Sequence, residues 1–462
     1  MHDVEPLSPE DATLLCATPP EAQLQIGALC CFEGGPLRDT DGGLRLDDLR
    51  DHVAACIHLI PRFRQRVRHV PFGLARPVWI DDVDFDLSRH IHDAVLPAPG
   101  GPAELRRFVA DLLGRPLDPD HPLWDLWLID GLDDGNVAVV LRAHHVVADG
   151  LSLLRAATAL LDFDADPSPD PPPDPWTAAS EPCPAALAIG ALAHRRRRQL
   201  ELLVDAGRAV LDPRRSLSLA TSILTGVTAP PTAPRTALTG RVGTRRDFLW
   251  ASVSLESMHR LARSRGVTIN DVVLAAVTGA LRRNMGDEPG PSMDRAPKVL
   301  VPIGDAADGH GGNRFSFVVA GLPVHLEDPG AVLDHVHREM STRKTSGQAR
   351  RMLRLFSVVD LLPVPLLRAT APGVLARQPL VNLAVTDLPG SEASLYLLGS
   401  RLLAMHPIVS GVGNIACIVG VLSYGDRLGI GLTVDPDVVR DPDRFMADLV
   451  GASNELCGLA AP

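Results

Sequence analysis

Short hydrophobic runs bounded by turn residues predict strands in the first third of the chain. Residues 123–129 and 136–141 form two such runs, and the intervening Asp133-Asp134-Gly135 suits a tight hairpin. Beyond the second run, a helical spacing links Leu151, Leu154, Thr158 and Leu161. The pattern predicts a strand, a turn, a second strand, a short loop and a helix, in that order.

The second half of the chain repeats this mixture of helices and strands. Its periodicity predicts helices at 271–283 and from 329 onwards, strands at 299–303 and 315–322, and a hairpin of 415–422 with 428–434. The sequence therefore belongs to the α/β class. Two mixed α/β halves of comparable size favour a ligand site in the cleft between them.

Two proline-rich segments separate these halves. Residues 164–176 read DADPSPDPPPDPW, in which proline fixes the backbone and removes amide donors too often for a helix or a sheet. A helical stretch is predicted at 185–211, and a passage rich in proline and threonine follows at 225–239. We expect an N-terminal domain at 1–163, a linker with a connecting helical segment at 164–240 and a C-terminal domain at 241–462.

The charge balance excludes one class of partner. The 462 residues include 45 Lys and Arg against 56 Asp and Glu, a net charge of −11, whereas gripping nucleic acid requires a basic surface. The seven scattered cysteines predict neither a disulfide framework nor a structural zinc site. The N-terminus carries no export signal and no apolar stretch is long enough to span a bilayer, so we expect a cytoplasmic protein.

The most informative motif is HHVVADG at 144–150, directly after the second predicted strand. Because side chains alternate along a strand, His144 and His145 should point in opposite directions, one to a cavity and one into the core. A neutral imidazole accepts a proton from a hydroxyl near neutral pH, although either histidine alone also fits a structural role. Asp149 orients the loop or caps the next helix, and Gly150 serves a close approach, a positive φ or merely the turn.

Further motifs resemble one known family over nearly the whole chain. The histidine motif is similar to the signature of the CoA-dependent acyltransferase superfamily, and the order of the other motifs resembles the bacterial bifunctional wax ester synthase/diacylglycerol acyltransferase family. The stretches that carry this resemblance are LSPEDATLL, FEGG, PRFRQRV and RPLDPDHPLWDLWLIDGL before the motif, and VTINDVVLAAVTGALRR and LYLLGSRL after it.

The resemblance implies a fold and a set of roles. The fold has two CoA-dependent-acyltransferase-like mixed α/β domains with an active-site cleft or tunnel between them. His145 becomes the general base, His144 a supporting residue and Gly150 a loop residue. Asp149 becomes a structural residue that pairs with an arginine, for which Arg64 is the candidate and Arg66 the runner-up. The reaction is direct acyl transfer that needs no metal and no cofactor, since acyl-CoA is a substrate.

The chain departs from the family pattern at several positions. The family commonly reads SNVPGP where this chain has TDLPGS at 386–391, Met-His where it has Leu24-Gln25, and Asn where it has Thr239. Asn270 and Asp271 match a family motif and are candidate supporting residues. Their alternative role is structural, because asparagine is a good N-cap and aspartate suits the positive end of a helix.

The implied activity is fatty acyl transfer to diacylglycerol, which makes triacylglycerol, with long-chain alcohols as a possible second acceptor that gives wax esters. Two alternatives stay open at this point: an acyltransferase of polyketide or peptide lipid synthesis that takes its donor from a carrier protein, and a non-catalytic lipid-binding protein of the same fold. The sequence leaves the oligomeric state open.

Basic and apolar residues occur together in two segments. Residues 185–211 contain Arg195, Arg196, Arg197 and Arg198 among leucines, and residues 350–356 read RRMLRLF. Cations near anionic lipids and apolar side chains at the headgroup boundary both favour a membrane surface. We expect peripheral association with the inner membrane or with lipid inclusions, although solvated arginines on a helix are the plain alternative.

Overall fold

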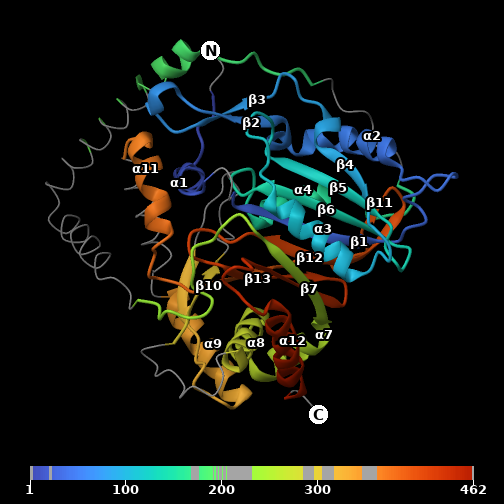
Figure 1. Cartoon of the computed structure of the whole chain (residues 1–462), viewed down its shortest axis with the longest axis vertical. Helices are drawn as coiled ribbons and strands as arrows, with labels where there is room; N and C mark the ends of the chain where they lie inside the picture. The colour runs from blue at the N-terminus through green and yellow to red at the C-terminus, as the bar shows by residue number, and fades with distance from the viewer. Residues whose placement is uncertain are drawn as a thin grey trace.

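The computed structural model describes residues 4–19, 23–167, 176–190, 232–284, 296–303, 317–345 and 362–459, with residues 192, 193, 196, 200 and 204. Its described strands form two six-stranded sheets and one small two-stranded sheet. The two large sheets lie one above the other in Figure 1, and helices cover their outer sides. The fold is therefore mixed α/β, as the sequence predicts.

The first sheet has the strand order β11-β12-β1-β6-β5-β4. The predicted hairpin is confirmed, because β5 and β6 pair antiparallel. The bounds of this half are α1 Pro9–Ala17, β1 Gln25–Phe32, α2 Leu46–Cys56, β2 Gln65–Arg68, β3 Val78–Asp81, β4 Ile91–Val95, α3 Pro102–Gly114, β5 Trp124–Asp130, β6 Val137–His144 and α4 Gly150–Ala159. Short 3-10 turns lie at Ile57–Leu59, Pro61–Arg64, Pro71–Gly73 and Leu87–Arg89.

The second sheet has the order β7-β14-β13-β10-β8-β9. Helices α7, α8, α9 and α12 gather at the lower end of Figure 1, where the C-terminus lies. The bounds are β7 Asp247–Ser254, α7 Leu255–Arg265, α8 Ile269–Asn284, β8 Lys298–Pro302, β9 Phe317–Gly321, α9 Pro329–Thr345, α11 Val364–Leu375, β10 Leu383–Leu388, β11 Tyr396–Leu397, β12 Ser400–Val409, β13 Cys417–Tyr424, β14 Arg427–Val434 and α12 Pro442–Gly458.

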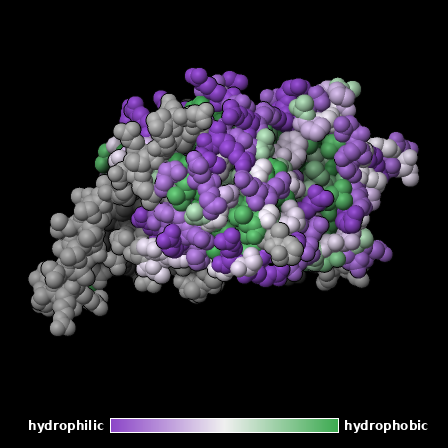
Figure 2. Space-filling view, turned by 90° about the horizontal axis from the view of Figure 1, so that it is seen from below, coloured by the Kyte–Doolittle hydropathy of each residue, from purple (hydrophilic) through white to green (hydrophobic). Residues whose placement is uncertain are grey.

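Helix α8 shows why this sequence forms a central core helix. Ten of its residues are buried, from Asp271 to Leu281, and they pack with α12 and the second sheet into one large hydrophobic core. A helix with so wide an apolar surface is stable only when neighbours cover most of its faces. The outward faces of this layer are mostly hydrophilic, with hydrophobic areas scattered among them (Figure 2).

Strand β12 crosses the domain boundary that the sequence suggests. Its residues belong to the predicted C-terminal domain at 241–462, yet β12 pairs antiparallel with β1 of the first sheet. The first sheet therefore includes two strands, β11 and β12, from beyond residue 241. The predicted linker at 164–176 and the helical stretch at 185–211 lie largely outside the described residues, apart from a helix at 184–190.

Glycines let the two sheets approach closely where β12 crosses the second sheet. A Cβ atom on Gly431 would lie 1.9 Å from the carbonyl oxygen of Pro407, and one on Gly429 would lie 2.0 Å from that of Met405. Both distances are impossible for a real side chain. Backbone therefore meets backbone at this crossing, and the remaining space between the sheets opens into a cavity.

Candidate active site

The two histidines of the motif lie where β6 ends. All eight residues of β6 are buried, and the chain then turns over residues 145–147 before α4 begins. His144 is 1% exposed, and its Nδ1 accepts a hydrogen bond from the backbone amide of Val146 at 3.2 Å. His145 lines the large cavity between the sheets, whereas His144 does not. The alternation of side chains along β6 separates the two imidazoles in this way.

The cavity beside His145 encloses about 1100 Å³ of space, including its mouth. Both halves of the chain build it: β1, β6 and α4 from one side, and β10, β12, β13 and the end of β8 from the other. Most lining side chains are apolar. The polar exceptions among the described lining residues are His145, Asp149, Thr386 and Asp387. Such a space accepts a long hydrocarbon chain and presents few groups that can do chemistry.

Burial keeps both imidazoles neutral. It lowers the pKa of His145 to about 4, although the charge of nearby Asp149 acts in the opposite direction. It lowers the pKa of His144 to about 3, and the neighbouring His145 lowers it further. Removal from water disfavours the charged imidazolium, which explains the direction of both shifts. His145 therefore presents an uncharged ring to the cavity at pH 7.

Asp149 and Gly150 fix the start of helix α4. The side chain of Asp149 is the N-cap and accepts a hydrogen bond from the amide of Ser152 at 2.7 Å. Gly150 does not have a positive φ, but a Cβ atom there would lie 3.1 Å from Leu388 on β10. Asp149 thus acts as a helix cap, and Gly150 allows a close approach to β10. The prediction of a positive φ at Gly150 is wrong.

The predicted pairing of Asp149 with an arginine is also wrong. The guanidinium of Arg64 lies over the ring of Trp176, 4.4 Å from its centroid. Arg66 donates to Glu181 at 2.8 Å and lies 4.0 Å from Asp82. Arg64 sits at the end of a 3-10 turn that leads into β2, so its side chain follows that small sheet toward Trp176.

Asp271 is structural and does not line the cavity. Helix α8 begins at Ile269, and Thr268 and Asp271 form reciprocal bonds between side chain and amide at 3.2 and 3.0 Å. This pair is a capping box, so the cap is Thr268 and the expectation of an Asn270 cap is wrong. Asp271 is 2% exposed and also bonds His337 at 2.8 Å. Neither Asn270 nor Asp271 is among the residues that line the cavity.

Thr386 and Asp387 are cavity residues whose role the sequence reasoning missed. They entered that reasoning only as a departure from SNVPGP. The Thr386 hydroxyl is buried and has no protein partner, which leaves a donor free in the cavity. Burial raises the pKa of Asp387 to about 6, while Lys344 acts in the opposite direction. The sequence does hold one hint of this position, because both residues lie in a short strand-like run that ends at Pro389-Gly390.

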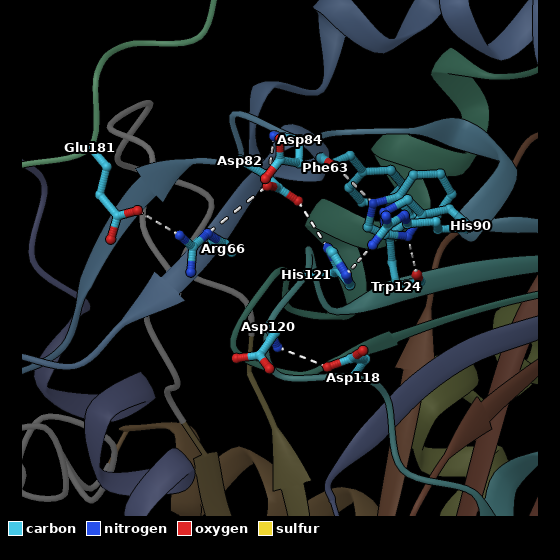
Figure 3. Close-up of polar contacts among 11 residues, drawn as sticks. Phe63, Arg66, Asp82, Asp84, His90, Asp118, Asp120, His121, Trp124 and Glu181 are labelled. Atoms are coloured by element: carbon cyan, nitrogen blue, oxygen red, sulfur yellow. Dashed lines mark hydrogen bonds and ion pairs between the residues drawn. The ribbon is translucent and has the colours of Figure 1, made fainter.

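A cluster of rings and carboxylates lies around the start of β5 (Figure 3). The rings of His90 and Trp124 stack at 4.6 Å, and Trp124 stacks in turn on Phe63 at 4.6 Å. Trp124 Nε1 donates to the Phe63 carbonyl at 2.8 Å, and His121 contacts Asp82 at 3.2 Å. These contacts hold the start of β5, where the Leu123 carbonyl accepts the amide of His144 at 2.9 Å. The cluster thereby fixes the end of β6 that carries the histidines.

The described residues lack two further kinds of feature. They contain no group of three or more His, Cys, Asp or Glu side chains arranged to hold a metal ion. In the same part of the chain, every helix is too short or too polar to cross a bilayer.

Comparisons with known proteins cover nearly the entire chain. Residues 7–273 match the model of the wax ester synthase/diacylglycerol acyltransferase catalytic domain, and residues 311–456 match that of the C-terminal domain of the same family. A probable diacylglycerol O-acyltransferase of Mycobacterium tuberculosis is 33% identical over 445 residues, which span 95% of this chain and 92% of that protein. A putative diacylglycerol O-acyltransferase of Mycobacterium bovis is 32% identical over the same shares.

Solved structures share the fold. The wax ester synthase/diacylglycerol acyltransferase of Marinobacter aquaeolei VT8 superposes with a TM-score of 0.66 at 24% identity, covering 98% of this chain and 99% of that one. The starter condensation domain of rhizomide synthetase, in complex with C8-CoA and Leu-SNAC, gives a TM-score of 0.60 at 15% identity over 99% of this chain and 95% of that domain. The chain belongs to the wax ester synthase/diacylglycerol acyltransferase family and is an acyltransferase of that type.

Proposed function

We propose that this acyltransferase moves a fatty acyl group from acyl-CoA to diacylglycerol, and that long-chain alcohols serve as a second acceptor. One observation carries the proposal: a neutral His145 lies on the wall of a mostly apolar cavity built by both halves of the chain. Each buried methylene contributes about 0.8 kcal/mol to binding, so the cavity favours long acyl chains. The C8-CoA bound to the rhizomide synthetase domain supports the choice of donor.

His145 acts as the general base in this mechanism. Its imidazole takes the proton of the acceptor hydroxyl while the oxygen forms a bond to the thioester carbonyl carbon. The resulting tetrahedral intermediate collapses, the carbon–sulfur bond breaks, and the coenzyme A sulfur takes the proton back from His145. Burial disfavours the imidazolium, which speeds this return of the proton.

Thr386 supplies the second catalytic group. During attack the carbonyl oxygen gains negative charge, and a donor fixed in a dry site stabilises that charge strongly. The unpartnered hydroxyl of Thr386 lines the same cavity as His145. It therefore donates to the developing oxyanion without first breaking a bond within the protein.

Product identity tests this function. Purified protein is incubated with labelled palmitoyl-CoA and either dioleoylglycerol or hexadecanol, and the lipids are separated by thin-layer chromatography. We expect labelled triacylglycerol, and wax ester with the alcohol. Binding of palmitoyl-CoA without product would favour the non-catalytic lipid-binding alternative. Product only from an acylated carrier protein would favour the carrier-dependent one.

We further propose that the protein meets its insoluble acceptor at a membrane or lipid-inclusion surface. The arginines of the two expected basic segments lie outside the described residues, except Arg196, which is exposed. Among the described residues, support comes from Phe72 (89% exposed), Leu366 (47%) and Val374 (69%). Pro365 at the start of α11 lies against Gly73, so Phe72 and this apolar helix are neighbours.

Flotation with phosphatidylglycerol vesicles tests the surface contact. The parent protein should float, and changing Arg195, Arg196, Arg197 and Arg198 together to Gln should weaken flotation, since each cation near anionic lipid contributes about 1 kcal/mol. The exposed Arg263, Arg338, Arg427 and Arg440, changed together to Gln, give a control with the same loss of charge that keeps binding. A parent that fails to float, or flotation indifferent to both salt and the fourfold change, would contradict the electrostatic contact.

A further inference from the structure

A second cavity carries an unusual concentration of positive charge. It encloses about 1050 Å³ including its mouth, shares no lining residue with the cavity of His145, and is lined by three arginines, Arg235, Arg241 and Arg377. No carboxylate appears among its described lining residues. This is notable in a chain with a net charge of −11, because acidic partners are plentiful elsewhere on the protein.

The three guanidinium groups are available to an external ligand. All three residues are exposed, and no ion pair within the described part of the chain involves them. By contrast, Arg106 on α3 and Arg245, two residues before β7, each bind a carboxylate, at 2.6 and 2.7 Å. Arg377 Nη1 donates only a long bond to the Gly373 carbonyl, at 3.5 Å. Within the described part of the chain, the arginines of the second cavity therefore keep most of their donors for an external anion.

The floor of the second cavity is rigid and its hydrogen bonds are already used. Asn382 is fully buried; its Nδ2 donates to the Pro234 carbonyl at 2.6 Å and to Thr239 Oγ1 at 2.9 Å, and its Oδ1 accepts the Lys298 amide at 2.8 Å. Gln378 Nε2 donates to Asn414 Oδ1 at 2.6 Å. With these amides satisfied, the arginines are the groups left to select a ligand, and they select for negative charge.

The segment of strand β10 and the residue before it contributes to the walls of both cavities. Asn382 lies directly before β10 in the second cavity, and Thr386 lies on β10 in the cavity of His145. Four residues of extended strand span about 13 Å. The pantetheine arm of coenzyme A, which separates the thioester from the diphosphate, has about as many bonds as four extended residues and thus a similar reach of about 14 Å.

We propose that the second cavity, with Arg235, Arg241 and Arg377, binds the phosphate groups of the acyl-CoA donor while the thioester lies beside His145. This inference rests on the proposed use of acyl-CoA. Planar guanidinium groups bind phosphate oxygens in pairs of hydrogen bonds. An anionic lipid headgroup offers the same phosphate chemistry, so the experiment must separate the two sources.

The test compares three proteins with two donors. The proteins are the parent, the triple variant Arg235→Gln, Arg241→Gln and Arg377→Gln, and a control with the same loss of charge, Arg263→Gln, Arg427→Gln and Arg440→Gln, whose residues are exposed and line neither cavity. The donors are palmitoyl-CoA and palmitoyl-N-acetylcysteamine, a thioester without phosphate. Initial rates with dioleoylglycerol give KM and kcat for each pair, and thermal melts verify folding.

For palmitoyl-CoA we expect the triple variant to raise KM about tenfold or more with little change in kcat, because charge-assisted bonds to phosphate are lost. The control triple should keep the KM of the parent. For palmitoyl-N-acetylcysteamine all three proteins should have equal kcat/KM. Salt should raise the KM of the parent for palmitoyl-CoA, since exposed charges are screened.

Two results would overturn the assignment, and both differ from failure of the proposed function. An unchanged KM for palmitoyl-CoA in the triple variant would show that the phosphates bind elsewhere. Loss of flotation on phosphatidylglycerol vesicles together with an unchanged KM would assign the cavity to a lipid headgroup. A parent protein that accepts neither palmitoyl-CoA nor the short thioester would instead refute the acyl-CoA function itself.

Discussion

The chemistry of this acyltransferase depends on a few polar side chains in an apolar space. His145 is more than 200 residues from Thr386 and Asp387 in the sequence, and the cavity between the sheets brings the three together. His144, one residue before the proposed base, faces away from the cavity and bonds the loop at Val146. Neighbouring histidines in one motif thus have separate tasks.

Replacing the proposed base is the first residue-scale prediction. His145→Ala should lower kcat about 10²-fold or more, because a general base contributes at least that much to proton transfer, and should leave folding intact. His144→Ala should lower kcat less but reduce the thermal midpoint, since His144 is 1% exposed and bonded to the loop. Radiolabelled product formation and circular dichroism melts measure both effects. Near-normal turnover by the folded His145→Ala variant would contradict a general-base role for His145.

Thr386 gives a second residue-scale prediction. Thr386→Val keeps the shape of the side chain but removes the hydroxyl, so kcat should fall about 10²-fold while the KM for palmitoyl-CoA changes little. Thr386→Ser retains the hydroxyl and should recover most of the rate. If valine and serine variants turn over equally, the hydroxyl does not stabilise the oxyanion.

At the scale of elements, the site depends on where one helix begins. Asp149 caps α4, and Gly150 lets the first turn of α4 approach Leu388 on β10. The helix therefore positions the loop 145–149 against the opposite half of the molecule. A capping box at Thr268 and Asp271 plays the same structural part for α8.

The cap leads to a prediction about stability and coupling. Asp149→Ala should cost about 1 kcal/mol in the free energy of unfolding, and Asp149→Asn, which still caps, should cost much less. The losses of unfolding free energy caused by Arg64→Ala and by Asp149→Ala should be additive in the double variant. Arg64 contacts Trp176 rather than Asp149, and substitutions at separate sites act independently. Urea denaturation of the single and double variants measures this. A coupling energy well above about 0.5 kcal/mol would instead support an ion pair between Asp149 and Arg64.

At the scale of the whole molecule, burying the site makes stability depend on pH. The folded state holds His144 and His145 with pKa values of about 3 and 4, whereas both rise to the ordinary value of about 6.5 on unfolding. Below pH 6.5 the unfolded chain binds more protons, so stability falls as the pH drops from 6.5 toward 4. Asp387, with its pKa raised to about 6, acts in the opposite sense: its contribution to the stability of the fold increases as the pH falls through 6.

Urea titrations at pH 7 and pH 5 test this dependence. Each of the two motif histidines should account for about 2 kcal/mol of stability lost between these pH values. His145→Gln should therefore reduce the loss by that amount. His259→Gln, a change at an exposed position, should keep the loss seen in the parent. A pH dependence that is identical in all three proteins would mean that His145 is not buried neutral in the folded state.

The sequence by itself determined the local features of this protein. Alternation and turn residues located β5, β6 and the hairpin of β13 with β14, because a strand and its turn depend mainly on neighbouring residues. The motif at 144–150 and the order of other motifs identified the family, since those residues occur along the chain in the order the family shares. The family models and relatives confirm that identification.

Only the tertiary structure decided which distant residues meet. Periodicity does not reveal that β12 joins the first sheet, because strand order depends on packing between segments far apart in sequence. For the same reason the predicted partner of Asp149 was not Arg64. The Asp149 carboxylate accepts a bond from the nearby Ser152 amide, while Arg64 stacks on Trp176, over 100 residues away from it in sequence. The polar residues of the first cavity likewise come together only when the two halves fold against each other, and the arginines of the second cavity only when the segments at 235–241 and 377 meet.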